Sequence, residues 1–181
     1  NEFDWFWMWA NCTLLGQDRL STQFLLQYPY KYILNTNNVI GTIDPKTATD
    51  EQKGYLGVAQ ANRAMMYLDI ARMFEFLPNK VTSNINADGN DVTGLTVPII
   101  KPNMSNDSAR VNPRATKEKM TAFILEDLKN AEQNIIHLKD TRGQTLPDLA
   151  VVYGLEARLY LWMGDYANAE KAARNAINNA S

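Results

Sequence analysis

Few residues in this chain of 181 residues have types and spacings that could support catalysis. There is one histidine, His137, so no second histidine exists to build a zinc site. Glu126 and Asp127 are adjacent, and on a helix they diverge by about 100°, so they cannot converge on one substrate bond. The sequence has no G-x-S-x-G nucleophile motif and no phosphate-binding glycine loop. We therefore predict a protein that is not an enzyme and that has no cofactor.

One loop has a pattern that resembles a calcium site. Asn84, Asn86 and Asp88 alternate and are followed by Gly89, as in loops that bind calcium through side-chain oxygens. The twelfth position of such a loop should be a bidentate glutamate, but here it is Leu95. Asn and Asp side chains also form backbone turns of their own. We expect a turn-forming loop and no metal site.

Aromatic side chains are the remaining candidates for ligand binding. Trp5, Trp7 and Trp9 cannot all face inward, because consecutive residues of a helix are rotated by about 100°. A further group of tyrosines surrounds Pro29 in a polar stretch. Exposed rings beside polar side chains can hold the flat C–H faces of sugars, although aromatic residues in helical proteins more often lie in the core. The predicted ligand-binding residues are Trp5, Trp9, Asn11, Asp18, Tyr30 and Tyr32.

Composition excludes several other classes of function. The net charge is −2 and the 18 basic residues are scattered, so nothing favours a nucleic-acid partner. No apolar stretch approaches the ~20 residues that a membrane-spanning helix needs. Cys12 is the only cysteine, which excludes an internal disulfide and is typical of a half-buried thiol. The chain begins without a methionine, as a piece of a longer protein would.

Apolar residues recur at helical spacing through most of the chain, and no segment alternates well enough to form a long strand. Thr116 is a good N-cap, and Pro78 should end the helix before it. We predict an all-α chain of one domain, residues 1–181. Its helical regions should cover about residues 3–27, 51–77, 116–138, 147–163 and 166–180.

The last two of these helices should form an antiparallel pair. Gly164 is suited to close the first helix in a left-handed conformation, and Asp165 can cap the second. Small and aromatic residues around such a turn match the helix–turn–helix unit of tetratricopeptide repeats. The residues expected to be mostly buried between the two helices are Tyr153, Ala157, Tyr160, Ala169 and Ala173.

Two long stretches, residues 28–50 and 79–115, are rich in Asn, Thr, Asp, Gly and Pro and should be irregular loops. Loops longer than about 12–15 residues in compact domains are usually functional or disordered. The helices would then form the frame, and the loops would supply the surface that faces a ligand.

Three segments, in this order and separation, resemble the SusD/RagB family of outer-membrane glycan-capture lipoproteins. They are AQANRAMMYLDIARMF (59–74), NPRATKEKMTAFILEDLKNAEQNI (112–135) and LAVVYGLEARLYLWMGDYANAEKAA (149–173). The matching positions in the first two are Ala61, Arg63, Ala64, Tyr67, Leu68, Arg72, Pro113, Arg114, Thr116, Ile124, Asp127, Leu128 and Ala131. Departures occur at Phe76–Pro78, where a glycine is usual, and at Met120, where an aromatic residue is usual.

The resemblance implies an N-terminal portion of a tetratricopeptide-like helical protein that binds an oligosaccharide or polysaccharide without acting on it. It also implies a SusC-like TonB-dependent transporter as partner, and a position on the outer membrane facing outward. Contact with the membrane would be made only through a lipid anchor that this chain does not contain.

A second hypothesis is a helical-repeat scaffold for a protein or peptide, without sugar binding. The long loops favour the first hypothesis, because a plain repeat adaptor would have short turns and a regular period. The sequence does not indicate which glycan would be bound.

Overall fold

The computed structural model describes residues 19–142 and 145–180, and this part of the chain is helical. It has no β-strand, only two isolated bridges, between Ile85 and Asp91 and between Leu95 and Thr116. The predicted all-α class is therefore confirmed. The helices are α2 (Leu20–Thr42), α3 (Asp50–Phe74), α4 (Asn106–Arg110), α5 (Lys117–Ile135), α6 (Leu149–Met163) and α7 (Tyr166–Asn179).

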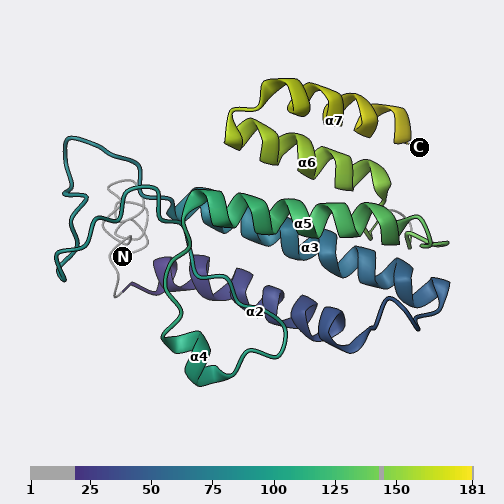
Figure 1. Ribbon diagram of the computed structural model, residues 1–181, viewed down its shortest axis with the longest axis horizontal. Coiled ribbons are helices and arrows are strands. Elements are labelled where there is room, and N and C mark those ends of the chain that lie inside the picture. The colour runs from purple at the N-terminus through teal and green to yellow at the C-terminus, as the bar shows by residue number, and fades with distance from the viewer. Residues whose placement is uncertain (1–18, 143–144, 181) are drawn as a thin grey trace, which may run out of the picture.

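The five long helices lie side by side, and each runs in the opposite direction to the one before it (Figure 1). Each packs on the preceding long helix, in the order α2, α3, α5, α6, α7. This stacking of helical hairpins is the tetratricopeptide-like arrangement that the sequence predicts. It leaves α2 and α7 at the two edges of the stack. None of the helices described is long and apolar enough to cross a membrane.

Four of the five long helices begin at a side chain that accepts a hydrogen bond from a backbone amide of the first turn. Thr49 and Gln52 form a reciprocal capping box at the start of α3. Thr116, Asp148 and Asp165 cap α5, α6 and α7 by accepting one backbone N–H bond each, without the reciprocal bond. The predicted caps at Thr116 and Asp165 are therefore confirmed.

The turn between α6 and α7 also forms as predicted. Gly164 has φ of 79°, a left-handed conformation that glycine adopts without strain, and it closes α6. Ala157 and Ala169 are buried, as expected for a close helix contact. Tyr153, Tyr160 and Ala173 are half-buried, so the interface is less enclosed than the sequence suggests.

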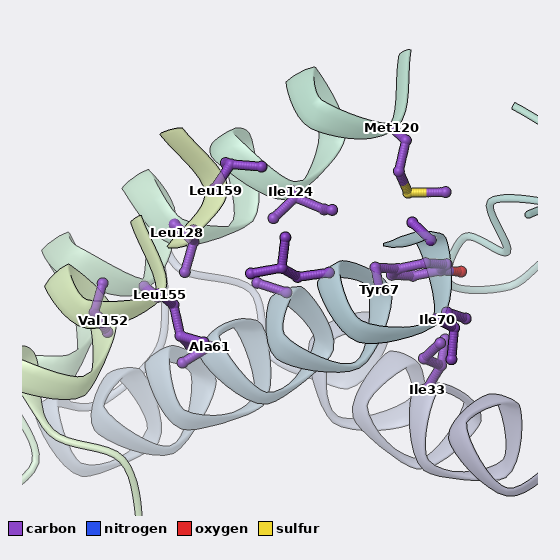
Figure 2. Packing of buried hydrophobic residues seen from close by; sticks show 14 of the residues in the cluster. Ile33, Ala61, Tyr67, Ile70, Met120, Ile124, Leu128, Val152, Leu155 and Leu159 are labelled. Atoms are coloured by element: carbon purple, nitrogen blue, oxygen red, sulfur yellow. The ribbon is translucent and has the colours of Figure 1, made fainter. Parts of the chain in front are cut away.

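The hydrophobic core lies mainly between α3, α5 and α6, with Ile33 of α2 added at one side (Figure 2). Tyr67 of α3, Ile124 and Leu128 of α5 and Leu159 of α6 are each fully buried. Within each helix, the buried apolar side chains recur every three or four residues and so form one stripe along one face. The core forms where these stripes pack against each other.

Two glycines allow α3 to approach the C-terminal end of α5 closely. A β-carbon added at Gly57 would lie 2.5 Å from the backbone nitrogen of Ile135, and one at Gly54 would lie 2.9 Å from the α-carbon of Leu138. Neither position has room for a side chain, because the neighbouring atoms belong to the backbone.

The prediction that residues 28–50 form a loop is wrong for most of that stretch, because α2 continues to Thr42. Of the predicted helix at 3–27, residues 20–27 are helical and form the start of α2, while residues before 19 lie outside the described part. The helix tolerates Pro29 although this residue cannot donate a hydrogen bond to the carbonyl of Leu25. The residues of α2 that face inward recur at helical spacing and compensate for this loss: Leu26, Tyr30, Ile33, Asn37 and Ile40.

The other predicted bounds differ by smaller amounts. α3 ends at Phe74 instead of residue 77, because the chain turns extended at Glu75 and the backbone of Phe76 bonds to Gly94 and Leu95. α5 spans 117–135 instead of 116–138, α6 begins at 149 instead of 147 and α7 ends at 179 instead of 180. Residues 79–115 are irregular as predicted, apart from the five-residue helix α4.

Candidate functional site

Helix α2 carries aromatic residues on two opposite faces. Because each residue turns the helix by about 100°, Tyr28 and Tyr32 lie within about 40° of each other, whereas Tyr30 is about 160° away from either. The structure follows this geometry: Tyr28 and Tyr32 are exposed, and Tyr30 is half-buried. The three tyrosines therefore belong to two different environments.

Tyr30 is part of the packing between α2 and the rest of the chain. Its hydroxyl donates a hydrogen bond to the carbonyl oxygen of Pro98 at 2.6 Å. Its ring packs edge-on against Tyr67, with the centroids 6.4 Å apart. Burial, and to a lesser extent the neighbouring Tyr67, raises the pKa of Tyr30 far above its ordinary value. This side chain stays neutral and holds the segment around Pro98 against α2.

A buried ion pair lies behind this inward face. Arg63 of α3 donates two hydrogen bonds to the carboxylate of Asp127 of α5, at 2.8 and 2.6 Å, and a third to the side-chain oxygen of Asn37 at 2.6 Å. The guanidinium also lies 5.1 Å from the ring centroid of Phe123. Burial raises the pKa of Asp127, and the bonds from Arg63 oppose that shift. The pair joins α2, α3 and α5 at one point.

The same region fixes the segment at 95–100. The Asn37 amide donates to the carbonyl of Ile100 at 2.9 Å, and the amide of Ile100 donates to the Tyr67 hydroxyl at 2.8 Å. Burial raises the pKa of Tyr67 to about 12. Arg114 donates to the carbonyl oxygens of Phe74, Leu95 and Thr96, each at 2.7 Å. The inward side of α2 and the middle of the long stretch at 79–115 are therefore held together by hydrogen bonds between side chains and backbone.

The outward face of α2 presents an exposed row of rings: Phe24, Tyr28 and Tyr32, spaced four residues apart. Their exposed fractions are 60%, 56% and 38%. Phe24 and Tyr28 are stacked, with centroids 5.6 Å apart and an angle of 26° between the rings. Within the described ranges, neither the Tyr28 nor the Tyr32 hydroxyl makes a hydrogen bond to the protein. We refer to these three residues as the aromatic ladder.

Polar side chains flank the aromatic ladder. Lys31, Asn35 and Asn38 are exposed and, by the rotation of the helix, lie within about 80° of Tyr28. Ring faces with a free hydroxyl can pack on the C–H faces of a sugar, while amides and an ammonium group can bond its hydroxyls. Exposed Leu20 and Leu25 border the same face, within about 80° of Tyr28, whereas exposed Leu34 lies about 120° away from it. The surface therefore suits a ligand that has both apolar and polar faces.

The predicted site residues are divided by the structure. Trp5, Trp9, Asn11 and Asp18 lie outside the described residues. Tyr32 lies on the aromatic ladder, while Tyr30 points into the protein, and the two are not brought together. Sequence reasoning did not select Phe24 and Tyr28 as site residues. The signal that identifies them is the spacing of four residues from Phe24 to Tyr28 to Tyr32.

The calcium-like loop forms backbone turns, as the sequence predicts. The side-chain oxygen of Asn86 accepts hydrogen bonds from the amides of Asp88 and Asn90, at 3.0 and 2.9 Å. Gly89 has φ of 79°. Groups of three or more His, Cys, Asp or Glu residues arranged to hold a metal ion are not found within the part of the chain that the structure covers.

No protein-family model and no curated protein sequence matches this chain, but solved structures do. A SusD-like carbohydrate binding protein from Bacteroides vulgatus matches with a TM-score of 0.69 and 20% identity, over 86% of this chain and 31% of that protein. A putative sugar binding protein from Bacteroides vulgatus matches with a TM-score of 0.63 and 28% identity, over 85% of this chain and 32% of that one. A SusD superfamily protein from Bacteroides thetaiotaomicron matches with a TM-score of 0.64 and 24% identity, over 83% of this chain and 31% of that protein.

These matches confirm the predicted resemblance at the level of the fold: the described part of the chain has a SusD-like arrangement of helices. The chain spans about a third of the length of the proteins it matches.

Proposed function

We propose that this chain belongs to a protein that binds an oligosaccharide or polysaccharide without acting on it, and that the aromatic ladder is a contact surface for the glycan. The observation that carries the proposal is the exposed row of Phe24, Tyr28 and Tyr32 beside polar side chains. The fold shared with a SusD-like carbohydrate binding protein supports the same class of ligand.

The geometry of the ladder favours an extended ligand. Rings four residues apart on a helix are separated by about 6 Å along its axis, so three rings span about 12 Å. Each stacked ring contributes on the order of 1 kcal/mol beyond ordinary burial. A chain of linked sugar rings could contact several of these side chains at once, whereas a single sugar would contact one or two.

Affinity electrophoresis of the full-length protein in gels that contain different neutral and acidic polysaccharides tests this proposal. Tyr28→Ala and Tyr32→Ala should each weaken binding about fivefold to tenfold, because about 1 kcal/mol is lost with each ring. The matched control is Tyr166→Ala: Tyr166 is 72% exposed and lies on α7, at the other edge of the stack. It should bind like the parent protein.

The melting temperature of each variant separates binding from folding. Tyr28→Ala and Tyr32→Ala should leave it nearly unchanged, because both rings are exposed. Unchanged glycan affinity in both variants would show that the ladder is not the site. The earlier candidates Trp5, Trp9, Asn11 and Asp18, with Tyr30, would then be substituted in the same assay.

Exposed leucines of α2 favour a second candidate function, a helical scaffold that binds another protein. Leu20, Leu25 and Leu34 are 81%, 39% and 55% exposed. An apolar surface of this kind is typical of protein interfaces. Leu34→Asp would disrupt such an interface and should leave glycan binding unchanged. A ladder that binds no polysaccharide, together with loss of a protein partner in Leu34→Asp, would favour the scaffold.

We further propose that the protein delivers its glycan to a SusC-like TonB-dependent transporter, at the outer surface of the outer membrane and held there by a lipid anchor. Support comes from the resemblance of the three sequence segments and from the SusD-like fold. Co-purification of the full-length protein from detergent-solubilised outer membrane tests this step. Recovery without a barrel partner, under conditions that preserve such complexes, would contradict it.

A further inference from the structure

A cavity of about 530 Å³ lies beside the first half of α5 and is separate from the aromatic ladder. Its walls come from residues 99–104 and 112–116, both in the long connection between α3 and α5, and from α5 itself between Lys119 and Glu126. No residue of α2 lines it. The connection that contains α4 therefore forms a hollow against α5.

The charged residues that line this cavity are mostly cationic. Lys101, Arg114 and Lys119 face one carboxylate, Glu126, which leaves two positive charges in excess. Among residues 19–142 and 145–180, neither lysine forms an ion pair. Arg114 donates to backbone carbonyls and, in the same described ranges, forms no salt bridge with a carboxylate. A concave surface lined by one sign of charge attracts ligands of the opposite sign.

Most of the rest of the lining is apolar, and its uncharged polar residues are Asn112 and Thr116. Ile99, Met104 and Phe123 contribute side chains to the wall. Phe123 is held in place by the guanidinium of Arg63, 5.1 Å from its centroid, and by the edge-on ring of Tyr67, 5.3 Å away. The cavity thus combines a fixed apolar wall with cations, which suits a ring that bears an acidic group.

A second cluster of charged residues, around Lys129, has no excess of positive charge. Lys129 lies 2.9 Å from Glu156 and 3.2 Å from Glu132, so its charge is already matched by carboxylates of the same cluster. The hollow there is also smaller, about 190 Å³. The unmatched lysines set the cavity at α5 apart from this internally paired cluster.

We infer that the cavity between residues 99–104, 112–116 and α5 binds a sugar residue that carries a carboxylate. This inference rests on the proposed glycan-binding function and narrows its ligand to acidic polysaccharides. The carboxylate would lie between Lys101 and Lys119, and the C–H face of the sugar would pack on Phe123 and Met104.

Titration calorimetry of the full-length protein with two matched probes tests the inference. The probes are galacturonic acid trimers and the methyl esters of the same trimers, which keep the rings and remove the charge. We expect the acid to bind at least tenfold more tightly than the ester. Raising the salt from about 50 mM to about 500 mM should weaken only the acid, because salt screens exposed charges.

The double variant Lys101→Ala/Lys119→Ala should remove most of the preference for the acid and leave binding of the ester unchanged. The control is Lys46→Ala/Lys80→Ala, which removes the same charge from two exposed lysines outside the cavity. Melting temperatures of both doubles should match the parent, which excludes a folding defect as the cause.

Equal binding of acid and ester, or an equal loss in both double variants, would overturn the inference. A protein that binds neutral polysaccharides but neither probe would also overturn it and leave the proposed function intact. If the acid binds through Lys101 and Lys119 while the ladder variants bind every glycan normally, the cavity is a site and the ladder is not.

Discussion

The two faces of α2 use the same kinds of residue for different purposes. On the inward face, the Tyr30 hydroxyl and the Asn37 amide bond to backbone carbonyls of Pro98 and Ile100. On the outward face, Tyr28 and Tyr32 are exposed and their hydroxyls have no partner in the described part of the chain. A tyrosine whose polar atom is already bonded contributes to stability, whereas one whose ring and hydroxyl are free can bind a ligand.

The largest effect should come from breaking the ion pair behind the inward face. Asp127→Ala would leave the buried Arg63 guanidinium without its carboxylate and should lower the free energy of unfolding by about 3–5 kcal/mol. Urea unfolding followed by circular dichroism measures this. The control is Asp69→Ala at the half-exposed pair of Asp69 and Arg158, which should cost less than about 1 kcal/mol. Similar losses in both variants would contradict the difference in burial.

Two tyrosines two residues apart provide a direct test of the comparison between the faces. Tyr30→Ala removes a packed ring and a hydrogen bond and should cost about 2–4 kcal/mol of stability. Tyr28→Ala should change stability by less than about 0.5 kcal/mol, because that ring is exposed. The same urea measurement applies to both. If the two costs were equal, the assignment of the faces would be wrong.

Tyr67→Phe should cost about 1–3 kcal/mol at neutral pH, because the amide of Ile100 loses its partner. Tyr67→Phe should also change how the free energy of unfolding depends on pH in alkaline solution. The pKa of Tyr67 is raised from 10.0 to about 12, so above pH 10 the unfolded chain loses this proton first. The stabilising contribution is complete below pH 10 and is lost as pH rises through about 12.

Unfolding measured between pH 9 and pH 12 should therefore show a shallower fall in stability for Tyr67→Phe than for the parent. Tyr30 also has a raised pKa, so some of the fall should remain in this variant. If stability fell with pH equally steeply in parent and variant, Tyr67 would not contribute to the loss of stability at alkaline pH.

The smallest effect on stability should come from removing single tyrosine hydroxyl groups. Tyr30→Phe should cost about 1 kcal/mol, the value of one hydrogen bond, while Tyr28→Phe should have no measurable effect on stability. Thermal unfolding of the two variants side by side measures the difference. A cost for Tyr28→Phe that equals the cost for Tyr30→Phe would mean that the Tyr28 hydroxyl has a partner in the folded protein.

Local signals were sufficient to predict most of the helical frame. Gly164, Asp165 and Thr116 act within one turn of the chain, and the structure has each of them in the predicted role. The helix across residues 28–42 was missed because Pro29 and the polar run NTNN at 35–38 resemble a loop. Asn37 is compatible with the core because Arg63, 26 residues away, donates to its side-chain oxygen and its amide donates to the carbonyl of Ile100.

The candidate site depends on the same missed helix. Tyr30 and Tyr32 were expected to act together because they are close in sequence. On a helix they face opposite sides, so only Tyr32 joins the ladder. The charge excess at the cavity was not predicted, because it depends on contacts between residues 99–104 and α5 that sequence spacing does not indicate.

The pair of glycines in α3 makes the contact between α3 and α5 a wedge. At Gly54 and Gly57 the two backbones almost touch, whereas farther along α3 the rings of Tyr67 and Phe123 stand between them with centroids 5.3 Å apart. The two helices are therefore in contact through backbone at one end and through aromatic rings at the other. Side chains at positions 54 and 57 would force the narrow end open and so change the width of the wide end. The close approach of α3 to the C-terminal end of α5 thus depends on two positions that have no room for even a β-carbon.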